Sequence, residues 1–340
     1  MKILLSSPRI SGVGGIAHHV RTLARKLRDK GFVVDILSAE YLKIPSLKNL
    51  ANPLYGLLSY LKTITKEYDI VHGHNLPSLP AILSSSGGKV LTLHGLYSKQ
   101  IRLLHGQQLG YMAEVVEKKF LRKLDAITTV SMEALKYYEG LGLKVEHIPN
   151  AIDLLDLPKD SERICSPQIT YLGRLSYEKG VDLLIETAAR YGLRGLVIAG
   201  DGPLRRFFEK AHEKKLLTYL GPLPRWRALR VLAGSDAAIL PSRQEGISTF
   251  LLEAMALKIP VIASKVGGNI EIIQENVEGI LIEPDAGEIA KAARNVLTKT
   301  IPVDKMIDKA YNKILTQYEW NTVLKKYLNV YARILDLKRF

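Results

Sequence analysis

The architecture of the chain is set by residues 2–37, KILLSSPRISGVGGIAHHVRTLARKLRDKGFVVDIL. A short apolar run at residues 2–6 leads into a glycine-rich turn, and apolar residues then recur at helical spacing over residues 16–30. Gly31 ends this helix, and a second apolar run follows at residues 32–37. The order strand, glycine turn, helix, strand is the repeating unit of a parallel α/β sheet.

The same alternation continues along the rest of the chain. Strand-like runs lie at residues 69–72, 90–94, 126–130 and 145–148, and after a polar stretch they resume at 169–172, 195–199, 237–240, 261–263 and 279–282. We therefore predict an α/β protein with two Rossmann-like, doubly wound domains that face each other across a cleft. The expected boundaries are residues 1–160 and 161–317, with a final helix in residues 318–340 that packs back towards the first domain.

Composition excludes several classes of protein. With 340 residues, 47% of them hydrophobic, the chain has enough apolar material for two cores, which excludes a mostly disordered chain. Cys165 is the single cysteine, so neither an intrachain disulfide nor a cysteine metal cluster is expected. We expect a cytoplasmic protein, because the apolar start is too short for a signal peptide and no apolar run is long enough to span a membrane.

The glycine turn after the first strand suits a phosphate. Backbone N–H groups approach an anion closely at glycines, and a helix N-terminus behind them favours negative charge. The same turn also fits a dinucleotide fingerprint formed by Gly12, Gly14 and Ala17, with Asp35 near the place of a ribose-binding acid. A NAD-dependent dehydrogenase is therefore an alternative interpretation.

Two further motifs carry charges that suit a nucleotide. Arg174 and Lys179 stand in a loop after the strand at residues 169–172, and a guanidinium with a flexible ammonium suits a pyrophosphate. Glu245 and Glu253 flank a turn that opens a helix, where Glu253 would accept hydrogen bonds from a vicinal diol such as ribose. A solvated loop, and a Glu253 that only pairs locally, are the alternatives. Burial of an acid in an apolar helix requires a partner.

Three histidines, His72, His74 and His94, stand at the ends of two neighbouring strands of the first domain. A zinc site is one interpretation, but no acidic residue accompanies them at these strand ends, and we expect no metal. A hydrogen-bonding or catalytic histidine at the cleft is the preferred interpretation.

The net charge of +14 favours anionic partners, although it also suits solubility alone. It is spread evenly, because residues 1–160 hold 21 basic and 14 acidic residues and the remainder holds 27 and 20. No strip of alternating aromatic and basic residues supports RNA stacking, so nucleic acid is not expected, and a non-catalytic binding module ranks below the enzymes. Residues 99–123 mix apolar and basic residues, and such a helix either packs on the core or docks peripherally on an anionic membrane, which would be the inner membrane surface.

Taken together, these motifs resemble the retaining glycosyltransferases of family 4 (glycosyl transferase group 1), which have the GT-B fold. The resemblance covers nearly the whole chain in order. Its motifs are Gly14-Gly15, His94-Gly95, residues 148–153 (IPNAID), Gly173-Arg174-Leu175 with Lys179-Gly180, residues 200–203 (GDGP), the two glutamates, Gly267-Gly268 and Trp320.

The resemblance implies transfer of a hexosyl unit from a nucleotide-diphosphate sugar, with UDP or GDP favoured, to an acceptor hydroxyl with retention of configuration and without a metal or other cofactor. The first domain would bind a saccharide or lipid-linked acceptor. Arg174 and Lys179 would hold the diphosphate with backbone amides, Glu253 the ribose and Glu245 the sugar hydroxyls. The implied catalytic residues are His94, Glu245, Arg174 and Lys179, and the implied donor-binding residues are Gly14, Gly15, Arg174, Lys179, Gly200, Leu223, Ser248, Thr249, Phe250 and Glu253.

The sequence departs from the family pattern in two places. Residues 247–249 are Ile-Ser-Thr, where the family often has an aromatic or apolar residue followed by glycine or proline. Lys258 stands where the family usually has glycine. A lysine suits the dipole at a helix C-terminus but does not suit a left-handed cap.

Overall fold

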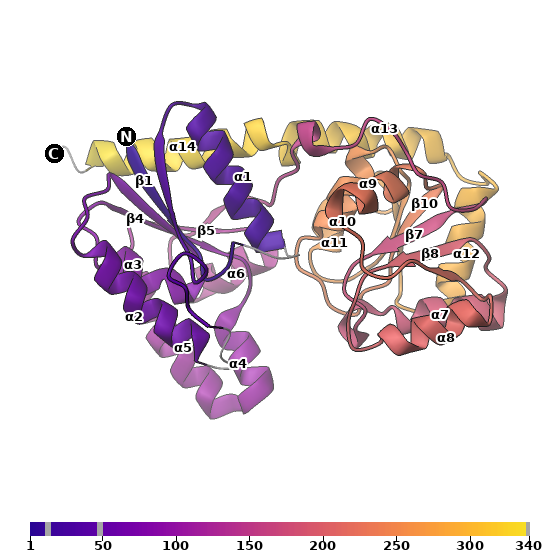
Figure 1. Ribbon diagram of the computed structural model, residues 1–340, viewed down its shortest axis with the longest axis horizontal. Coiled ribbons are helices and arrows are strands. Elements are labelled where there is room, and N and C mark those ends of the chain that lie inside the picture. Colours follow the sequence, from indigo (N-terminus) through magenta and orange to yellow (C-terminus); the bar gives the residue numbers. More distant parts are fainter. Residues whose placement is uncertain (11–14, 46–49, 338–340) are drawn as a thin grey trace. The chain divides into compact units, whose positions relative to one another are not determined.

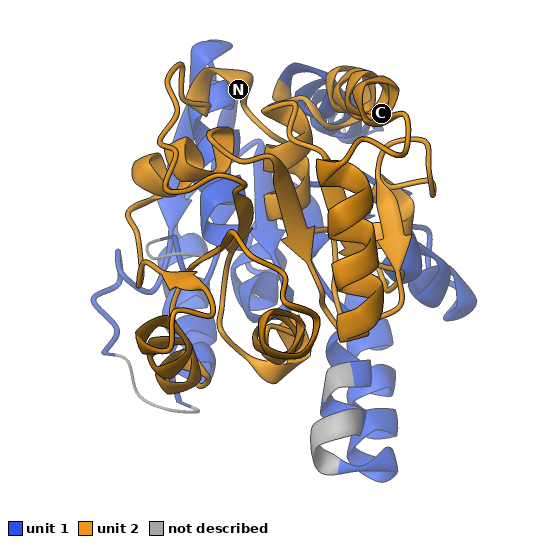
Figure 2. Cartoon of the chain, turned by 90° about the vertical axis from the view of Figure 1, so that its right-hand side faces the viewer, with its two compact units in different colours: residues 1–150, 321–340 blue, residues 151–320 orange. Residues whose placement is uncertain are grey.

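A computed structural model of the chain describes residues 1–10, 15–45 and 50–337. The chain divides into two compact units (Figure 2): unit 1 comprises residues 1–150 and 321–340, and unit 2 comprises residues 151–320. The chain therefore passes from one unit to the other between Asn150 and Ala151, whereas the sequence placed this boundary at residue 160. Within the described ranges, none of the helices combines the length and the apolar character that a membrane-spanning helix needs.

Unit 1 is built on a six-stranded parallel sheet with strand order β2-β1-β3-β4-β5-β6, and helices cover both of its faces (Figure 1). The strands are β1 (Lys2–Ser6), β2 (Val33–Leu37), β3 (Ile70–His74), β4 (Gly88–Leu93), β5 (Ala126–Thr129) and β6 (Glu146–His147). The helices are α1 (Gly15–Asp29), α2 (Ala51–Thr63), α3 (Leu79–Leu83), α4 (Tyr97–His105), α5 (Gln107–Leu121), α6 (Met132–Gly140) and α14 (Trp320–Leu337), with a 3₁₀ turn η1 (Leu76–Ser78) before α3.

Unit 2 repeats this plan with the strand order β12-β11-β10-β7-β8-β9, again all parallel. The strands are β7 (Ile169–Leu172), β8 (Leu196–Ala199), β9 (Thr218–Tyr219), β10 (Ala237–Leu240), β11 (Val261–Ser264) and β12 (Ile280–Ile282). The helices are α7 (Asp182–Tyr191), α8 (Arg205–Glu213), α9 (Arg225–Ala233), α10 (Thr249–Ala256), α11 (Asn269–Ile272), α12 (Ala286–Leu297) and α13 (Val303–Lys313). The two doubly wound parallel sheets predicted from the sequence are confirmed.

The strand order places a topological switch point in each unit. In unit 1 the chain leaves β1 for β2 on one side and later adds β3 on the other, and in unit 2 β8 and β10 flank β7 in the same way. Loops diverge at the carboxyl ends of such neighbouring strands and leave room for a ligand. We therefore expect a ligand at the loops after β1 and β3 in unit 1, and at the loops after β7 and β10 in unit 2.

Both sheets read as continuous apolar runs because helices cover their two faces. All four residues of β8, β10 and β11 are buried, and β3 is buried throughout. Burial of each large aliphatic side chain contributes on the order of 1.5–3 kcal/mol to folding. The strands are thereby fixed, and their carboxyl ends form a rigid edge for the loops that follow.

The last helix, α14, belongs to unit 1 after its first residue. Val323, Tyr327, Val330, Tyr331 and Ile334 recur at helical spacing and are buried. A Cβ added at Gly88, the first residue of β4, would come within 2.7 Å of the Ile334 side chain. Close packing of α14 on the sheet therefore brings its tyrosines next to β3 and β4.

Three local expectations were wrong. Residues 99–123 do not form one helix, because Gly106 takes a φ of +91° and separates α4 from α5. The third strand does not end at His72 but continues through His74. Lys258 does adopt the left-handed conformation, with a φ of +58°, directly after Leu257, which caps α10. Its Nζ lies 4.7 Å from the centroid of the Tyr311 ring, a cation–π contact that offsets part of the strain.

Candidate functional site

The loop after β7 presents two cations at the switch point of unit 2. Its path is held by Tyr171, whose hydroxyl donates to the carbonyl of Arg174 at 2.8 Å. The Arg174 side chain is 67% exposed, and its guanidinium lies 3.9 Å from the carboxylate of Glu178. An ion pair this long and this exposed is weak, so the Arg174 guanidinium is available to an anionic ligand.

Lys179 contacts the loop that follows β10, the strand next to β7. Its Nζ lies 2.7 Å from both carboxylate oxygens of Glu245. The Ser242 hydroxyl donates to Oε2 of the same carboxylate at 2.9 Å. The Glu245 side chain is only 9% exposed. The structure thus brings together two of the predicted site residues that lie 66 positions apart in the sequence.

Two glycines permit this approach of the loops. Gly180 has a φ of +63°, and a Cβ there would lie 1.9 Å from the carbonyl oxygen of Pro241. Gly267 has a φ of +46°, and its Cβ would lie 1.9 Å from the carbonyl oxygen of Glu245. No side chain fits at such distances, so the glycines of these motifs fix the position of Glu245.

Helix α10 begins beside this carboxylate. Ser248 is its N-cap, and the Ser248 hydroxyl accepts from the amide of Leu251. Thr249 and Phe250 are the first two helical residues, so no carbonyl of an earlier turn faces their amides. The helix therefore directs two N–H groups and the positive end of its dipole towards an incoming phosphate.

Glu253 lies in the second turn of α10. Its side chain is 8% exposed, and its carboxylate lies 2.6 Å from Nη1 of Arg225 in α9. Burial raises the pKa of the Glu253 carboxyl, and Arg225 opposes this shift. Sequence analysis missed Arg225. Its one signal is its place, two residues after Leu223, which the family resemblance assigns to donor binding.

The remaining predicted donor-binding residues are dispersed over other loops. Gly200 follows β8, and a Cβ there would lie 1.8 Å from the carbonyl oxygen of Gly173, so the loops after β7 and β8 also pack closely. Leu223 is half-buried in the loop after β9. Gly15 is the exposed first residue of α1 in unit 1, and Gly14 lies outside the described residues.

In unit 1, the predicted histidines form one cluster, in which His72 and His74 are buried and His94 is half-buried. His94 directly follows β4, and its backbone N–H donates to Oδ1 of Asn75 at 2.8 Å. Its Nε2 lies 3.1 Å from Nδ1 of His74. The His72 ring stacks on His74 with 4.5 Å between ring centroids. Side chains two apart on a strand share a face, which is why β3 delivers both rings to one place.

Helices α1 and α14 complete this cluster with residues that sequence analysis missed. Tyr331 places its hydroxyl 2.6 Å from Nδ1 of His72, whose Nε2 lies 2.7 Å from the Thr92 hydroxyl. Tyr327 places its hydroxyl 3.2 Å from Nε2 of His19. The tyrosines lie 259 and 308 positions from these partners, so no local pattern reveals the contacts.

Burial keeps these imidazoles uncharged. It lowers the pKa of His72 to about 3 and that of His94 to about 4, with the neighbouring His94 adding to the effect on His72. The pKa values of His19 and His74 are also lowered, chiefly by burial. At neutral pH the cluster therefore offers neutral hydrogen-bonding groups. In the described parts of the chain, no group of three or more histidine, cysteine, aspartate or glutamate residues is arranged to hold a metal ion.

The acid required by the dehydrogenase interpretation does not reach the carboxyl edge of the sheet. Asp35 lies in the middle of β2, opposite Leu4 of β1. Its carboxylate accepts a hydrogen bond of 2.9 Å from Tyr68, which precedes β3. A ribose-binding acid lies beyond the end of its strand, so Asp35 is not positioned for that role.

In a comparison with known proteins, models of glycosyltransferase families match both halves of the chain. Residues 13–155 match the model of Glycosyltransferase Family 4, and residues 159–313 match that of Glycosyl transferases group 1. The phosphatidylinositol N-acetylglucosaminyltransferase gpi3 subunit of Schizosaccharomyces pombe is 24% identical, with 94% of this chain and 78% of that protein aligned.

Two solved structures share the fold over almost the whole chain. Sucrose-phosphate synthase from Thermosynechococcus elongatus has a TM-score of 0.83 at 18% identity, covering 99% of both chains. Anabaena HepE in complex with UDP and glucose has a TM-score of 0.75 at 17% identity, covering 98% of this chain and 100% of HepE. Three findings agree, namely the order of the motifs, the two doubly wound sheets and both family matches. The chain therefore belongs to the family 4 (group 1) glycosyltransferases of the GT-B fold.

Proposed function

We propose that the chain transfers a hexosyl unit from a UDP- or GDP-sugar to a hydroxyl of an acceptor, with retention of the anomeric configuration. One observation carries the proposal: at the switch point of unit 2, the loop that carries Arg174 and Lys179 meets the loop that leads into α10, through the contact between Lys179 and Glu245. Two cations and a helix dipole together suit a nucleoside diphosphate. HepE was solved with UDP and glucose, which supports a donor of this class.

Each donor group has a proposed partner in unit 2. Arg174, Lys179 and the amides of Thr249 and Phe250 bind the diphosphate. Glu253, buried and held by Arg225, accepts hydrogen bonds from the ribose hydroxyls. Glu245 binds the sugar hydroxyls, since its carboxylate is fixed next to Lys179. The nucleobase lies near Gly200 and Leu223.

The proposed chemistry places positive charge where negative charge develops. As the glycosidic bond breaks, the β-phosphate of the leaving group gains negative charge, and preorganised donors stabilise it most at that stage. Loss of one such donor raises a barrier by about 3–4 kcal/mol. We propose that Arg174 and Lys179 supply this charge without a metal ion. Retention follows from attack on the face that the phosphate leaves, with the departing phosphate accepting the acceptor's proton.

The remaining proposed roles, a contact to the donor sugar and binding of the acceptor, belong to unit 1. His94 is neutral at pH 7, because burial lowers its pKa to about 4. We assign it a hydrogen bond to the donor sugar near the reacting carbon. Unit 1 also binds the acceptor, and the Schizosaccharomyces pombe relative, named for phosphatidylinositol, supports a saccharide bound to lipid as one acceptor class.

The experiment is a donor panel in EDTA with release of the nucleoside diphosphate as the readout. We expect one UDP- or GDP-sugar to be consumed, and Arg174→Ala with Lys179→Ala to abolish its consumption. Arg190→Ala is the matched control, because Arg190 is exposed and pairs with Glu186 on the surface of α7. NMR of the product would report the anomeric configuration. Nucleotide binding with no turnover for any donor and acceptor would instead favour a non-catalytic binding module.

A further inference from the structure

Helix α5 of unit 1 turns most of its large apolar side chains outward. Those between 49% and 64% exposed are Leu109, Tyr111, Met112, Val115 and Val116. The residues that it buries include Leu121, its last residue, and the acid Glu117, which is 3% exposed and accepts a hydrogen bond of 2.6 Å from the Tyr138 hydroxyl. Such a face requires a partner, because water is a poor environment for a contiguous apolar surface.

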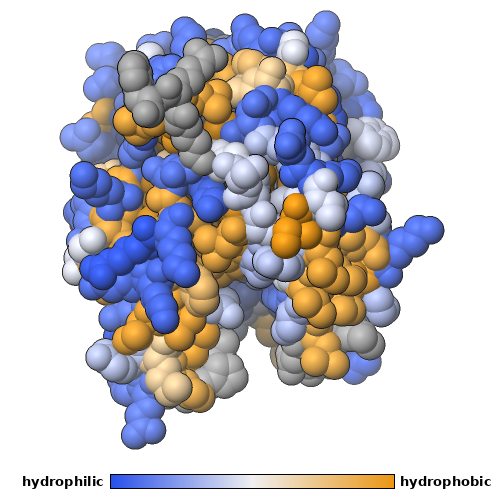
Figure 3. Space-filling model, turned by 90° about the vertical axis from the view of Figure 1, so that its left-hand side faces the viewer, coloured by the Kyte–Doolittle hydropathy of each residue, from blue (hydrophilic) through white to orange (hydrophobic). Residues whose placement is uncertain are grey.

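Helix α2 carries a second apolar stripe. Leu57, Leu61 and Ile64 follow one another at steps of four and three residues and are 51–59% exposed. The sequence of α2 contains no acidic residue. Figure 3 shows hydrophobic side chains gathered in two bands on this side of the molecule, with a hollow between them.

A groove of about 480 Å³ connects the α2 stripe to the edge of the sheet. Leu57 and Tyr60 form one wall, and the other wall contains Leu76 and Tyr97. Leu76 comes two residues after β3, and Tyr97 comes three residues after His94. The groove is thus apolar and begins at the carboxyl edge of the sheet where His94 lies.

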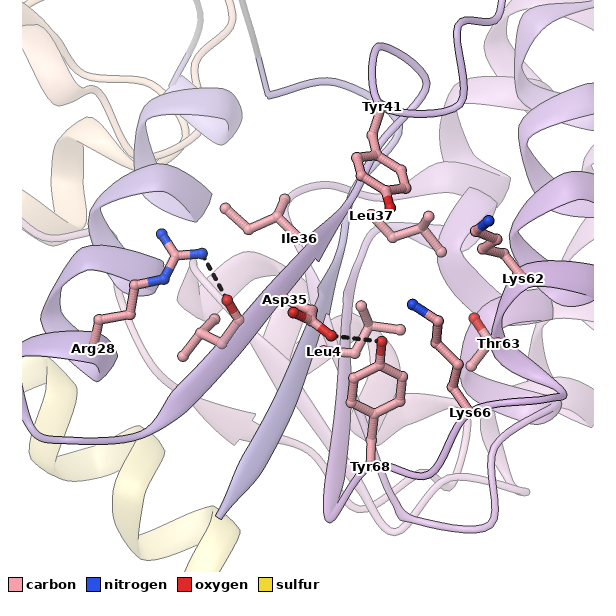
Figure 4. A pocket seen from close by; sticks show the side chains of 11 residues that line it. Leu4, Arg28, Asp35, Ile36, Leu37, Tyr41, Lys62, Thr63, Lys66 and Tyr68 are labelled. Atoms are coloured by element: carbon pink, nitrogen blue, oxygen red, sulfur yellow. Dashed lines mark hydrogen bonds between the residues drawn. The ribbon is translucent and has the colours of Figure 1, made fainter.

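Basic side chains lie beside the apolar surface. A pocket of about 160 Å³ lies at the end of α2. Figure 4 shows its Lys66 directed towards the hydrogen-bonded pair of Asp35 and Tyr68. Lys62 lines the same pocket. At the end of α5 the chain adds Lys118, Lys119, Arg122 and Lys123. Glu114, on the outer part of α5, forms an ion pair of 2.9 Å with Arg102.

We propose that unit 1 docks on an anionic lipid bilayer through the outer faces of α2 and α5, and that the groove between α2 and α4 holds the apolar part of a lipid acceptor. This inference rests on the proposed function and names its acceptor class. The apolar side chains enter the boundary of the acyl region, and the lysines and arginines contact anionic headgroups. The groove then guides the acceptor hydroxyl towards the edge that carries His94.

Charge favours a bilayer over a second copy of the chain as the occupant. A copy would bring the same basic residues against this surface, and like charges in contact oppose association. An anionic bilayer instead complements both features at once. Binding to it should weaken as salt screens the lysines, whereas a purely apolar contact would not weaken.

The test is co-sedimentation of the full chain with vesicles of phosphatidylcholine, with and without phosphatidylglycerol, at low and high salt. We expect binding to the anionic vesicles at low salt only. Leu57→Asp with Leu61→Asp, and separately Met112→Asp with Val116→Asp, should weaken it by about ten-fold or more, since each places a charge at the acyl boundary. Leu155→Asp with Phe207→Asp is the matched control, because both side chains are exposed but belong to unit 2.

Binding of UDP and GDP to the same variants separates this inference from the proposed function. All variants should bind the nucleoside diphosphate like the unmodified chain, because that site belongs to unit 2. An unchanged circular dichroism spectrum and an unchanged urea unfolding curve would show that unit 1 is folded in them. A chain that binds the nucleotide but never sediments with anionic vesicles contradicts the docking surface and leaves the transferase proposal intact. Variants that convert a dimer into a monomer, as measured by analytical ultracentrifugation, without any vesicle binding would assign the surface to a second copy and overturn the inference. A chain that binds no nucleoside diphosphate contradicts the proposed function itself.

Discussion

The Nδ1 atom of His74 lies 3.1 Å from the Nε2 atom of His94, so one ring donates a hydrogen bond to the other. Burial lowers the pKa of both histidines, and two neutral rings share a single proton at this contact. If His74 donates, His94 carries its own proton on Nδ1, and if His94 donates, its Nδ1 is an acceptor. In the proposed function, His74 therefore selects the tautomer that His94 presents to the donor sugar.

Replacement of His74 should reduce turnover more than donor binding. We expect His74→Phe to lower kcat by about ten-fold or more with little change in the donor KM, because the ring of His94 loses its orienting partner. His74→Asn retains a polar atom near the position of Nδ1 and should restore part of kcat. Steady-state kinetics with the consumed donor provide the measurement. Equal losses for both variants, with a raised KM, would indicate a structural role instead.

The buried histidines predict a loss of stability in acid. Their pKa values are lowered in the folded chain, so between about pH 6.5 and pH 4 the unfolded chain binds protons that the folded chain does not. Stability is therefore fully present above pH 6.5 and falls as the pH drops, by up to about 1.4 kcal/mol per pH unit for each such histidine. Urea unfolding at a series of pH values measures the slope. His72→Phe should reduce the slope, and an unchanged slope in this variant would contradict the assignment.

The pair formed by Arg225 and Glu253 predicts a non-additive response. Arg225→Ala leaves a buried carboxylate without its cation and should lower the free energy of unfolding by about 1–2 kcal/mol, less than for a fully buried pair because Arg225 is 44% exposed. Glu253→Gln in the same chain should recover most of this loss. Urea unfolding of the two single variants and the double variant gives the coupling energy. Additive losses would show that the two side chains do not interact.

Lys258 predicts a stabilising substitution. A residue with a side chain at a φ of +58° costs about 1–2 kcal/mol relative to its usual conformation. Lys258→Gly should therefore raise the free energy of unfolding by about 1 kcal/mol, with the lost contact to Tyr311 offsetting the rest. Lys258→Ala serves as the control, since alanine keeps the strain and loses the contact. Stabilisation by both variants would point to the charge of Lys258 rather than to its backbone.

The strands of both sheets were predictable because each is marked by a short apolar run in the local sequence. The run at residues 169–172 forms β7 with those same bounds, and the apolar strands read directly from the sequence because both faces of each sheet are covered. The helix break at Gly106 was not predicted, since apolar and basic residues continue on both sides of it. Periodicity alone does not distinguish a helix that faces the core from one such as α5, which buries Glu117 and exposes most of its large apolar residues.

The candidate donor-binding motifs could be read from the sequence, but their partners could not. Arg174, Lys179 and Glu245 were candidates because charges beside glycine turns suit phosphates and sugars. Arg225 and Tyr331 act on Glu253 and His72 through contacts that only the fold creates, across 28 and 259 positions of sequence. Motif reading finds groups that bind ligands, whereas side chains that orient them depend on tertiary packing.

Whether Arg174 and Lys179 bind a nucleoside diphosphate can be measured by a thermal-shift panel in EDTA. UDP, GDP, ADP and NAD would be added separately, and a ligand at about 100 times its Kd should add about 2.7 kcal/mol of stability. We predict a clear rise in Tm with UDP or GDP that Arg174→Ala with Lys179→Ala removes and that Arg190→Ala retains. A rise with NAD alone, or a rise that survives the double substitution, would contradict a nucleotide-sugar transferase built on these two cations.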